Sequence, residues 1–232
     1  MRIKGFQKTS LIDYPGKICS IIFLPKCNLR CGYCYNPELV LDKNLPEIKE
    51  EDLLETLEER KKFVDCVTIT GGEPTLHKDL PEFIQKIKEK GFKVKLDTNG
   101  TNPEMLKSLI EEKLIDFVAM DIKNVFEKYK KTANVEVNCE DLKESIKAII
   151  ESGIDHEFRT TVLPRLHKEE DITTIAKEYL TEAKKYVLQQ FIPAEKMLDE
   201  RFYLAEEGYS EKKLEEIRKE CDKYVKTEIR NI

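Results

Sequence analysis

The chain of 232 residues is long enough to bury one domain and short for two. Its 40 basic and 45 acidic side chains nearly balance, and this lack of a basic excess argues against a nucleic-acid partner. No apolar run approaches the roughly 20 residues that cross a bilayer, and the first residues lack the apolar core of a signal peptide. We therefore expect a cytoplasmic protein with no membrane partner.

Short β-branched runs alternate with charged amphipathic segments along most of the chain. Gly91 and Gly153 come just after two of the amphipathic segments, where a left-handed C-cap favours glycine. Strands are predicted at residues 18–24, 66–70, 93–97, 117–121, 157–163 and 186–191. Helices are predicted between them, at residues 50–62, 80–90, 103–113, 141–152 and 169–181.

The alternation of strands and helices predicts an α/β fold with a parallel sheet. About six βα units fit the chain, fewer than the eight of a closed barrel, so we expect a partial (β/α)6 TIM-like barrel. The barrel would occupy residues 18–192 of a single domain that spans residues 1–232. Ligands of such folds bind where the strands end, so the loops after the strands are the candidate functional segments.

Two extensions flank the predicted barrel. Residues 1–17 would add a β-ribbon with a turn at residues 13–16, because Asp-Tyr-Pro-Gly is a typical turn sequence. Residues 193–232 would add a last helix at 210–223 and an edge strand near 225–229.

Three cysteines gather in the loop after the first predicted strand, at Cys27, Cys31 and Cys34. Thiolates this close together can bind one metal centre, and soft sulfur ligands favour an iron–sulfur cluster or zinc. A fully ligated cluster or a structural zinc site would take a fourth ligand, but Cys19 and Cys66 both lie in predicted strands. Three cysteines leave one iron of a 4Fe–4S cluster open for catalysis. A zinc site completed by a distant residue, or three unconnected thiols, stays open as an alternative.

Glycine or polar residues also follow the next three predicted strands. These segments are Gly71-Gly72-Glu73-Pro74, Asp97-Thr98-Asn99-Gly100 and Asp121-Ile122-Lys123. Glycines at 71 and 72 would let the main chain approach a ligand closely, although they also suit a tight turn.

Arg159 is a charge inside the apolar fifth strand, where a buried guanidinium needs an acidic partner.

The cysteine loop, with the aromatic Tyr33 just before its third cysteine, resembles that of the radical S-adenosylmethionine (SAM) superfamily. The resemblance implies a barrel of the radical SAM type, in which the open iron is chelated by the amino and carboxylate groups of SAM. Reductive cleavage of SAM then gives methionine and a 5′-deoxyadenosyl radical. The glycine-rich loop resembles the superfamily motif whose main chain and glutamate contact the SAM ammonium group, which implies that role for Gly71, Gly72 and Glu73.

The two loops that follow look like those of glycyl-radical-enzyme activating enzymes. The resemblance implies that Lys123 contacts the SAM carboxylate. It also implies a monovalent cation bound by Asp97, Thr98 and Asp121. Asn99 belongs to the same loop and is a candidate contact for the SAM ribose, and Arg159 is a further candidate for the carboxylate. No catalytic side chain is expected beyond the cluster and SAM.

Longer stretches look like the anaerobic ribonucleoside-triphosphate reductase activating proteins, at residues 9–17, 23–31, 36–40, 157–161 and 189–191. This family abstracts a hydrogen atom from a glycine Cα of its partner reductase and leaves a glycyl radical there. The resemblance therefore implies a protein substrate, and an electron donor such as flavodoxin or ferredoxin. Two positions depart from the family. Lys26 stands where many relatives carry glycine, and Tyr35 where pyruvate formate-lyase activating enzyme carries histidine.

Two other functions remain open from the sequence. One is a radical SAM enzyme acting on a small molecule, like 7-carboxy-7-deazaguanine synthase, and the other is a non-catalytic metal-binding module. The histidines have no mutual spacing that suggests a metal site and are interpreted as structural or surface residues: His77, His156 and His167. Cys139 is likewise interpreted as a single core or surface thiol.

Overall fold

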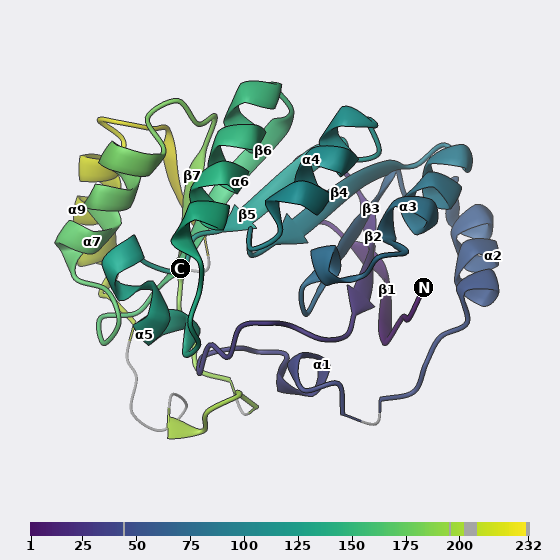
Figure 1. The fold of residues 1–232 in the computed structure, drawn as a ribbon, viewed down its shortest axis with the longest axis horizontal. Coiled ribbons are helices and arrows are strands. Elements are labelled where there is room, and N and C mark those ends of the chain that lie inside the picture. The colour runs from purple at the N-terminus through teal and green to yellow at the C-terminus, as the bar shows by residue number, and fades with distance from the viewer. Residues whose placement is uncertain (44, 195, 202–207, 231–232) are drawn as a thin grey trace. The chain divides into compact units, whose positions relative to one another are not determined.

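The computed structural model describes residues 1–43, 45–194, 196–201 and 208–230 (Figure 1). Parts of the predicted C-terminal extension, at residues 195, 202–207 and 231–232, therefore lie outside the described residues. The chain groups into two compact units. The N-terminal unit comprises Met1–Asn28, Glu38–Thr98 and Glu104–Val118, and the C-terminal unit comprises Leu29–Pro37, Asn99–Pro103 and Ala119–Ile232. The interpretation of the chain as a single domain stays a prediction.

In the N-terminal unit β1 is antiparallel to β2, as the predicted ribbon requires. Strand β5 begins in the N-terminal unit and ends in the C-terminal unit. Within the described residues the strands are β1 (Gly5–Ser10), β2 (Cys19–Leu24), β3 (Cys66–Gly71), β4 (Lys93–Thr98), β5 (Phe117–Asp121), β6 (Asp155–Val162), β7 (Tyr186–Gln190) and β8 (Thr227–Arg230).

The N-terminal unit is organised around β2, β3 and β4, which pair in parallel. Strand β2 buries almost all of its residues, because a parallel strand is covered on both faces. Helices α2 (Glu50–Arg60) and α3 (Leu80–Glu89) follow β2 and β3, and each turns its apolar residues inward: Leu53 and Leu57 on α2, and Phe83, Ile84 and Ile87 on α3. Helix α4 (Pro103–Glu111) follows β4. The predicted alternation of strand and helix is therefore confirmed in this unit.

The C-terminal unit pairs β6, β7 and β8 in parallel. Helix α6 (Cys139–Ser152) begins where the side chain of Asn138 accepts a hydrogen bond from the N–H of Glu140. It ends at Gly153, which takes the predicted left-handed conformation with φ +70°. Helix α7 (Glu169–Thr174) continues into a π-helix, η3 (Ile175–Tyr179), where the sequence predicts one regular helix. Helix α9 (Glu211–Cys221) lies beside α7 (Figure 1).

Short helices are the elements that the sequence does not predict. Each has three to five residues, too few to show a helical period. Two of them occupy the stretch between β5 and α6, directly after the Asp121-Ile122-Lys123 segment. The short helices are α1 (Pro37–Val40), η1 (Pro74–Leu76), η2 (Phe126–Lys128) and α5 (Tyr129–Ala133).

Among the helices of the described residues, none has the length and apolar character needed to cross a membrane.

Candidate active site

The predicted site residues all lie in the described part of the chain and fall into two groups, one in each unit. The group of the N-terminal unit contains Cys27, Gly71, Gly72, Glu73, Asp97 and Thr98. The group of the C-terminal unit contains Cys31, Tyr33, Cys34, Asn99, Asp121, Lys123 and Arg159.

In the N-terminal unit, the glycine-rich loop packs its main chain against the residues that lead to Cys27. The N–H of Gly72 donates to the carbonyl oxygen of Leu24 at 2.8 Å, and the N–H of Glu73 donates to that of Lys26 at 2.7 Å. A Cβ on Gly71 would overlap the Leu24 carbonyl oxygen, and a Cβ on Gly72 would overlap that of Lys26. Glycine is therefore required here by the protein's own main chain, whatever ligand the loop also binds.

Lys26 has a left-handed main chain, with φ +68°. Glycine adopts this conformation without steric cost, which explains why a glycine suits this position in relatives and why lysine is a strained substitute. The conformation is held by a hydrogen bond from the Lys26 N–H to the carbonyl oxygen of Leu39, at 2.8 Å. The preceding residue is also fixed, because Nε2 of His77 lies 2.8 Å from the carbonyl oxygen of Pro25.

Glu73 is almost completely buried and links the ends of β3 and β4. Its Oε1 atom accepts hydrogen bonds from the N–H of Thr75 at 3.1 Å, from Oγ1 of Thr75 at 2.6 Å and from Oγ1 of Thr98 at 2.8 Å. A buried carboxylate needs such donors to offset its desolvation. The glutamate that the sequence assigns to SAM is therefore already oriented by two threonines.

Asp97 forms an ion pair with Lys95, which is 2% exposed on β4. The sequence interpretation missed Lys95, although a lysine two residues before Asp97 lies on the same face of a strand. A buried ammonium group needs an anionic partner, and Asp97 supplies it. The carboxylate that was predicted to bind a monovalent cation thus already faces a cationic side chain.

In the C-terminal unit, Asp121 lies between two cationic side chains. Its Oδ1 is 2.7 Å from Nε of Arg159, and its Oδ2 is 3.0 Å from Nζ of Lys123. Burial opposes ionisation of Asp121, but the charges of Arg159 and Lys123 outweigh this effect and hold the pKa of Asp121 well below its ordinary range. The three groups carry one net positive charge, which suits an anionic ligand.

The second and third cysteines also lie in this unit. Cys31 is buried and Cys34 is half-buried, and the N–H of Cys34 donates to the carbonyl oxygen of Cys31 at 3.1 Å. Burial raises the pKa of the Cys31 thiol, and the charge of Lys123 offsets part of that rise. Burial also raises the pKa of the Cys34 thiol. Binding of a metal by these thiols would therefore release protons.

The C-terminal extension runs along the cysteine loop, a contact for which the sequence carries no signal. The N–H of Leu198 donates to the carbonyl oxygen of Cys34 at 3.2 Å. The hydroxyl of Tyr35 donates to the carbonyl oxygen of Ile192 at 2.8 Å and accepts from its N–H at 3.2 Å. The tyrosine that replaces a histidine of pyruvate formate-lyase activating enzyme therefore fastens the loop to the residues after β7.

Asn99 uses its side chain locally. Its Oδ1 accepts hydrogen bonds from the N–H of Thr101 at 3.0 Å and from Oγ1 of Thr101 at 2.7 Å. This is an Asx-type turn that shapes the loop after β4. The contact with a SAM ribose stays a prediction.

No three His, Cys, Asp or Glu side chains gather closely enough to hold a single metal ion, within residues 1–43, 45–194, 196–201 and 208–230.

Comparison with known proteins identifies the class of protein. The family model of the radical SAM superfamily matches residues 21–177. The solved structure of Streptococcus suis SuiB bound to S-adenosylmethionine covers 91% of this chain, which in turn covers 52% of SuiB, with a TM-score of 0.70 at 15% identity. The chain belongs to the radical SAM superfamily. It is an enzyme of that class, its cofactors are a 4Fe–4S cluster and SAM, and the predicted partial barrel is confirmed.

Two relatives carry names that narrow the class further. A putative glycyl-radical enzyme activating enzyme of Methanocaldococcus jannaschii is 41% identical over 210 residues, which cover 86% of this chain and 83% of the relative. The pyruvate formate-lyase-activating enzyme of Clostridium pasteurianum is 34% identical over 132 residues. That match covers 53% of each chain, so it extends over about half the length of this relative. The predicted resemblance to glycyl-radical-enzyme activating enzymes is confirmed.

Proposed function

We propose that this enzyme generates a 5′-deoxyadenosyl radical from SAM and uses it to abstract a hydrogen atom from a glycine Cα of a partner enzyme. The main support is the 41% identity to the archaeal relative, which extends over most of both chains. The finer proposal is that the partner is an anaerobic ribonucleotide reductase. It is supported by the resemblance at residues 9–17, 23–31, 36–40, 157–161 and 189–191.

The donor set suits the proposed cofactors. Cys27, Cys31 and Cys34 would bind three irons, because thiolates are the ligands that iron–sulfur clusters take. When bound, the cluster supplies the electron that cleaves SAM. Deprotonation of the buried Cys31 and the half-buried Cys34 would accompany assembly of the cluster.

The chain's own side chains would bind and orient SAM. Lys123 and Arg159 would attract the SAM carboxylate, since together with Asp121 they carry one net positive charge. The main chain of Gly71 and Gly72 and the oriented carboxylate of Glu73 would receive the ammonium group. A monovalent cation at Asp97, Thr98 and Asp121 stays a prediction. Such a cation would compete with Lys95 for Asp97.

The direct test uses the anaerobically reconstituted enzyme, dithionite, SAM and a purified anaerobic ribonucleotide reductase. We expect 5′-deoxyadenosine by chromatography and a glycyl-radical doublet on the reductase by electron paramagnetic resonance (EPR). A reductase whose radical-bearing glycine is replaced by alanine is the control and should show no doublet. 5′-Deoxyadenosine without a doublet would contradict the proposed partner and would favour a different glycyl radical enzyme or a small-molecule substrate.

The same assay addresses the electron donor. Replacing dithionite by reduced flavodoxin or ferredoxin should sustain 5′-deoxyadenosine formation if either protein serves as the donor. A cytoplasmic location stays a prediction from the sequence.

A further inference from the structure

Lys123 comes two residues after the end of β5. The residue between them, Ile122, still donates its N–H to the carbonyl oxygen of Arg159 on β6, at 2.8 Å. The main-chain groups of Lys123 are bonded instead by two buried side chains. Its N–H donates to the hydroxyl of Tyr129 at 3.2 Å, and its carbonyl oxygen lies 2.7 Å from Nε2 of His167. A loop residue is thus held on both sides by tertiary contacts.

The chemistry of the contact determines the state of His167. A carbonyl oxygen only accepts, so Nε2 must carry the proton and donate to Lys123. The other ring nitrogen, Nδ1, is 3.2 Å from the N–H of Leu163 and 3.3 Å from its carbonyl oxygen. That oxygen already accepts from the N–H groups of Leu166 and His167, at 3.0 Å and 2.8 Å, so Nδ1 is best placed as an acceptor of the Leu163 N–H.

His167 is therefore a neutral imidazole with one tautomer and one ring orientation. It is 1% exposed, and burial lowers its pKa. A ring whose two nitrogens both have main-chain partners cannot rotate without losing both hydrogen bonds.

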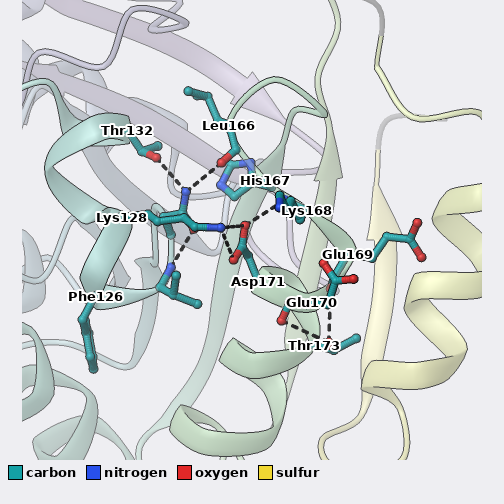
Figure 2. A network of polar contacts seen from close by, with 12 residues as sticks. Phe126, Lys128, Thr132, Leu166, His167, Lys168, Glu169, Glu170, Asp171 and Thr173 are labelled. Atoms are coloured by element: carbon teal, nitrogen blue, oxygen red, sulfur yellow. Dashed lines mark hydrogen bonds and ion pairs between the residues drawn. The ribbon is translucent and has the colours of Figure 1, made fainter.

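The surrounding contacts fasten the same two segments together (Figure 2). The side chain of Asn124, which is fully buried, donates from Nδ2 to Oγ1 of Thr132 at 2.9 Å and to the carbonyl oxygen of Leu166 at 3.0 Å. Lys128 pairs with both carboxylate oxygens of Asp171, at 2.6 Å and 2.7 Å. The β6–β7 connection thus supports the whole loop after β5, and His167 is the residue of that connection that bonds Lys123 itself.

We propose that His167 is a positioning residue, which holds the main chain of Lys123 so that the ammonium group faces the SAM carboxylate. The proposal rests on the proposed role of Lys123. Its physical basis is that the ammonium extends on a flexible side chain, so its reach depends on where Tyr129 and His167 hold the main chain, while Asp121 pairs with Nζ. The Lys123 side chain is 15% exposed and its Nζ lies 3.0 Å from Oδ2 of Asp121, so a small shift of its main chain would change both the ion pair and the ligand contact.

The test compares His167→Phe with His167→Gln in the reconstituted enzyme. Phenylalanine removes the donor and leaves the Lys123 carbonyl buried, so the KM for SAM should rise about tenfold, whereas kcat should stay within about threefold. Glutamine offers an N–H at a similar reach, so its KM should stay within about threefold of wild type. Binding of SAM, followed by the change it causes in the EPR signal of the reduced cluster, should weaken in parallel with KM.

His156 provides a matched control in the same unit. It is 4% exposed, its Nδ1 lies 2.9 Å from the carbonyl oxygen of Ile154, and its Nε2 accepts from the N–H of Lys184 at 3.1 Å. His156→Phe therefore loses the same kind of main-chain partners without touching Lys123. It should lower the thermal stability and leave the KM for SAM unchanged.

A double-mutant cycle with Lys123→Met separates positioning from general destabilisation. If His167 acts through Lys123, then His167→Phe should weaken SAM binding in the wild-type background and should have little effect in the Lys123→Met background. Equal losses in both backgrounds, or unchanged SAM binding in Lys123→Met itself, would overturn the inference. The cycle reads SAM binding alone, so it is independent of whether the reductase acquires a glycyl radical.

Discussion

The two groups of site residues are supported in different ways. In the N-terminal unit, Gly72 and Glu73 are held by main-chain hydrogen bonds to residues 24–26, at distances that leave no room for a Cβ at Gly72. In the C-terminal unit, Lys123 is held by the side chains of Tyr129 and His167. A loop held by close main-chain contacts should be destabilised by even one added methyl group. A loop held by side-chain contacts should tolerate substitutions that preserve a hydrogen-bond donor or a charge.

The largest expected effect comes from removing one of the three cysteines that are the predicted iron ligands, because neither kind of support can replace a ligand. Cys31→Ala should abolish both cluster binding and SAM cleavage, measured by iron content, visible absorbance and 5′-deoxyadenosine formation. Cys139→Ala is the control, since Cys139 lies at the start of α6 with Sγ 3.7 Å from the carbonyl oxygen of Phe126. Loss of the cluster in Cys139→Ala, or its retention in Cys31→Ala, would contradict the assignment of three ligands.

Gly72→Ala tests the main-chain support. The added methyl group would overlap the carbonyl oxygen of Lys26, so the loop must shift, and we expect a loss of roughly 3 kcal/mol in the free energy of unfolding. SAM cleavage should fall with it.

Gly16→Ala is the steric control. Gly16 has φ +69° and open space around the position of a Cβ, so its replacement should cost only about 1 kcal/mol, through backbone strain. Denaturant titrations of the two variants give the comparison. A loss in Gly72→Ala no greater than in Gly16→Ala would contradict the steric explanation.

Asp121→Asn tests the charge support in the C-terminal unit. It leaves Arg159 and Lys123 without their shared carboxylate, and we expect a loss of roughly 3 kcal/mol or less at pH 7, since these side chains are partly exposed. The lowered pKa of Asp121 stabilises the folded state above the ordinary carboxyl pKa, and this contribution is lost as the pH falls through the folded-state value.

The stability difference between wild type and Asp121→Asn should therefore stay constant from pH 7 to about 5, and shrink as the pH falls below the ordinary carboxyl pKa of about 4. Unfolding measured from pH 7 to below pH 4 provides the check. A difference that does not shrink below the ordinary carboxyl pKa would contradict the lowered pKa of Asp121.

The smallest expected effect is that of Lys26→Gly. Glycine relieves the left-handed strain at φ +68° but adds freedom to the unfolded chain, so the net change in the free energy of unfolding should be within about 1 kcal/mol. SAM cleavage should be preserved, because the carbonyl oxygen that accepts from Glu73 is unchanged. A loss of cleavage in a stable Lys26→Gly variant would give the lysine side chain a role of its own.

Much of the fold was predictable because its signals are local. The buried runs that became β2, β3, β4, β5 and β7 are continuous in the sequence, and Gly153 marks the end of α6 at the expected residue. The short helices η2 and α5 were not predictable, because a segment of three to five residues carries no helical period. Where the sequence predicts one helix at residues 169–181, the change to the π-helix η3 is equally invisible.

The candidate site likewise has features that local sequence patterns predict and features that they do not. The spacing of Cys27, Cys31 and Cys34 and the glycines at 71 and 72 are local patterns, and they were sufficient to indicate the class of enzyme. The sequence by itself thus determined the order of strands and helices and the family, and it predicted the donor set. These properties depend on residues that are neighbours in the chain.

Only the tertiary structure decided what each of these residues touches. It pairs the buried Lys95 with Asp97, places the Lys26 carbonyl where Gly72 can have no Cβ, and brings His167 to Lys123 from 44 residues away. Sequence spacing does not encode such contacts, because a hydrogen bond between distant segments depends on how β5 and the β6–β7 connection pack. His167, which the sequence analysis interprets as a structural or surface residue, is therefore the residue whose interpretation the fold changes most.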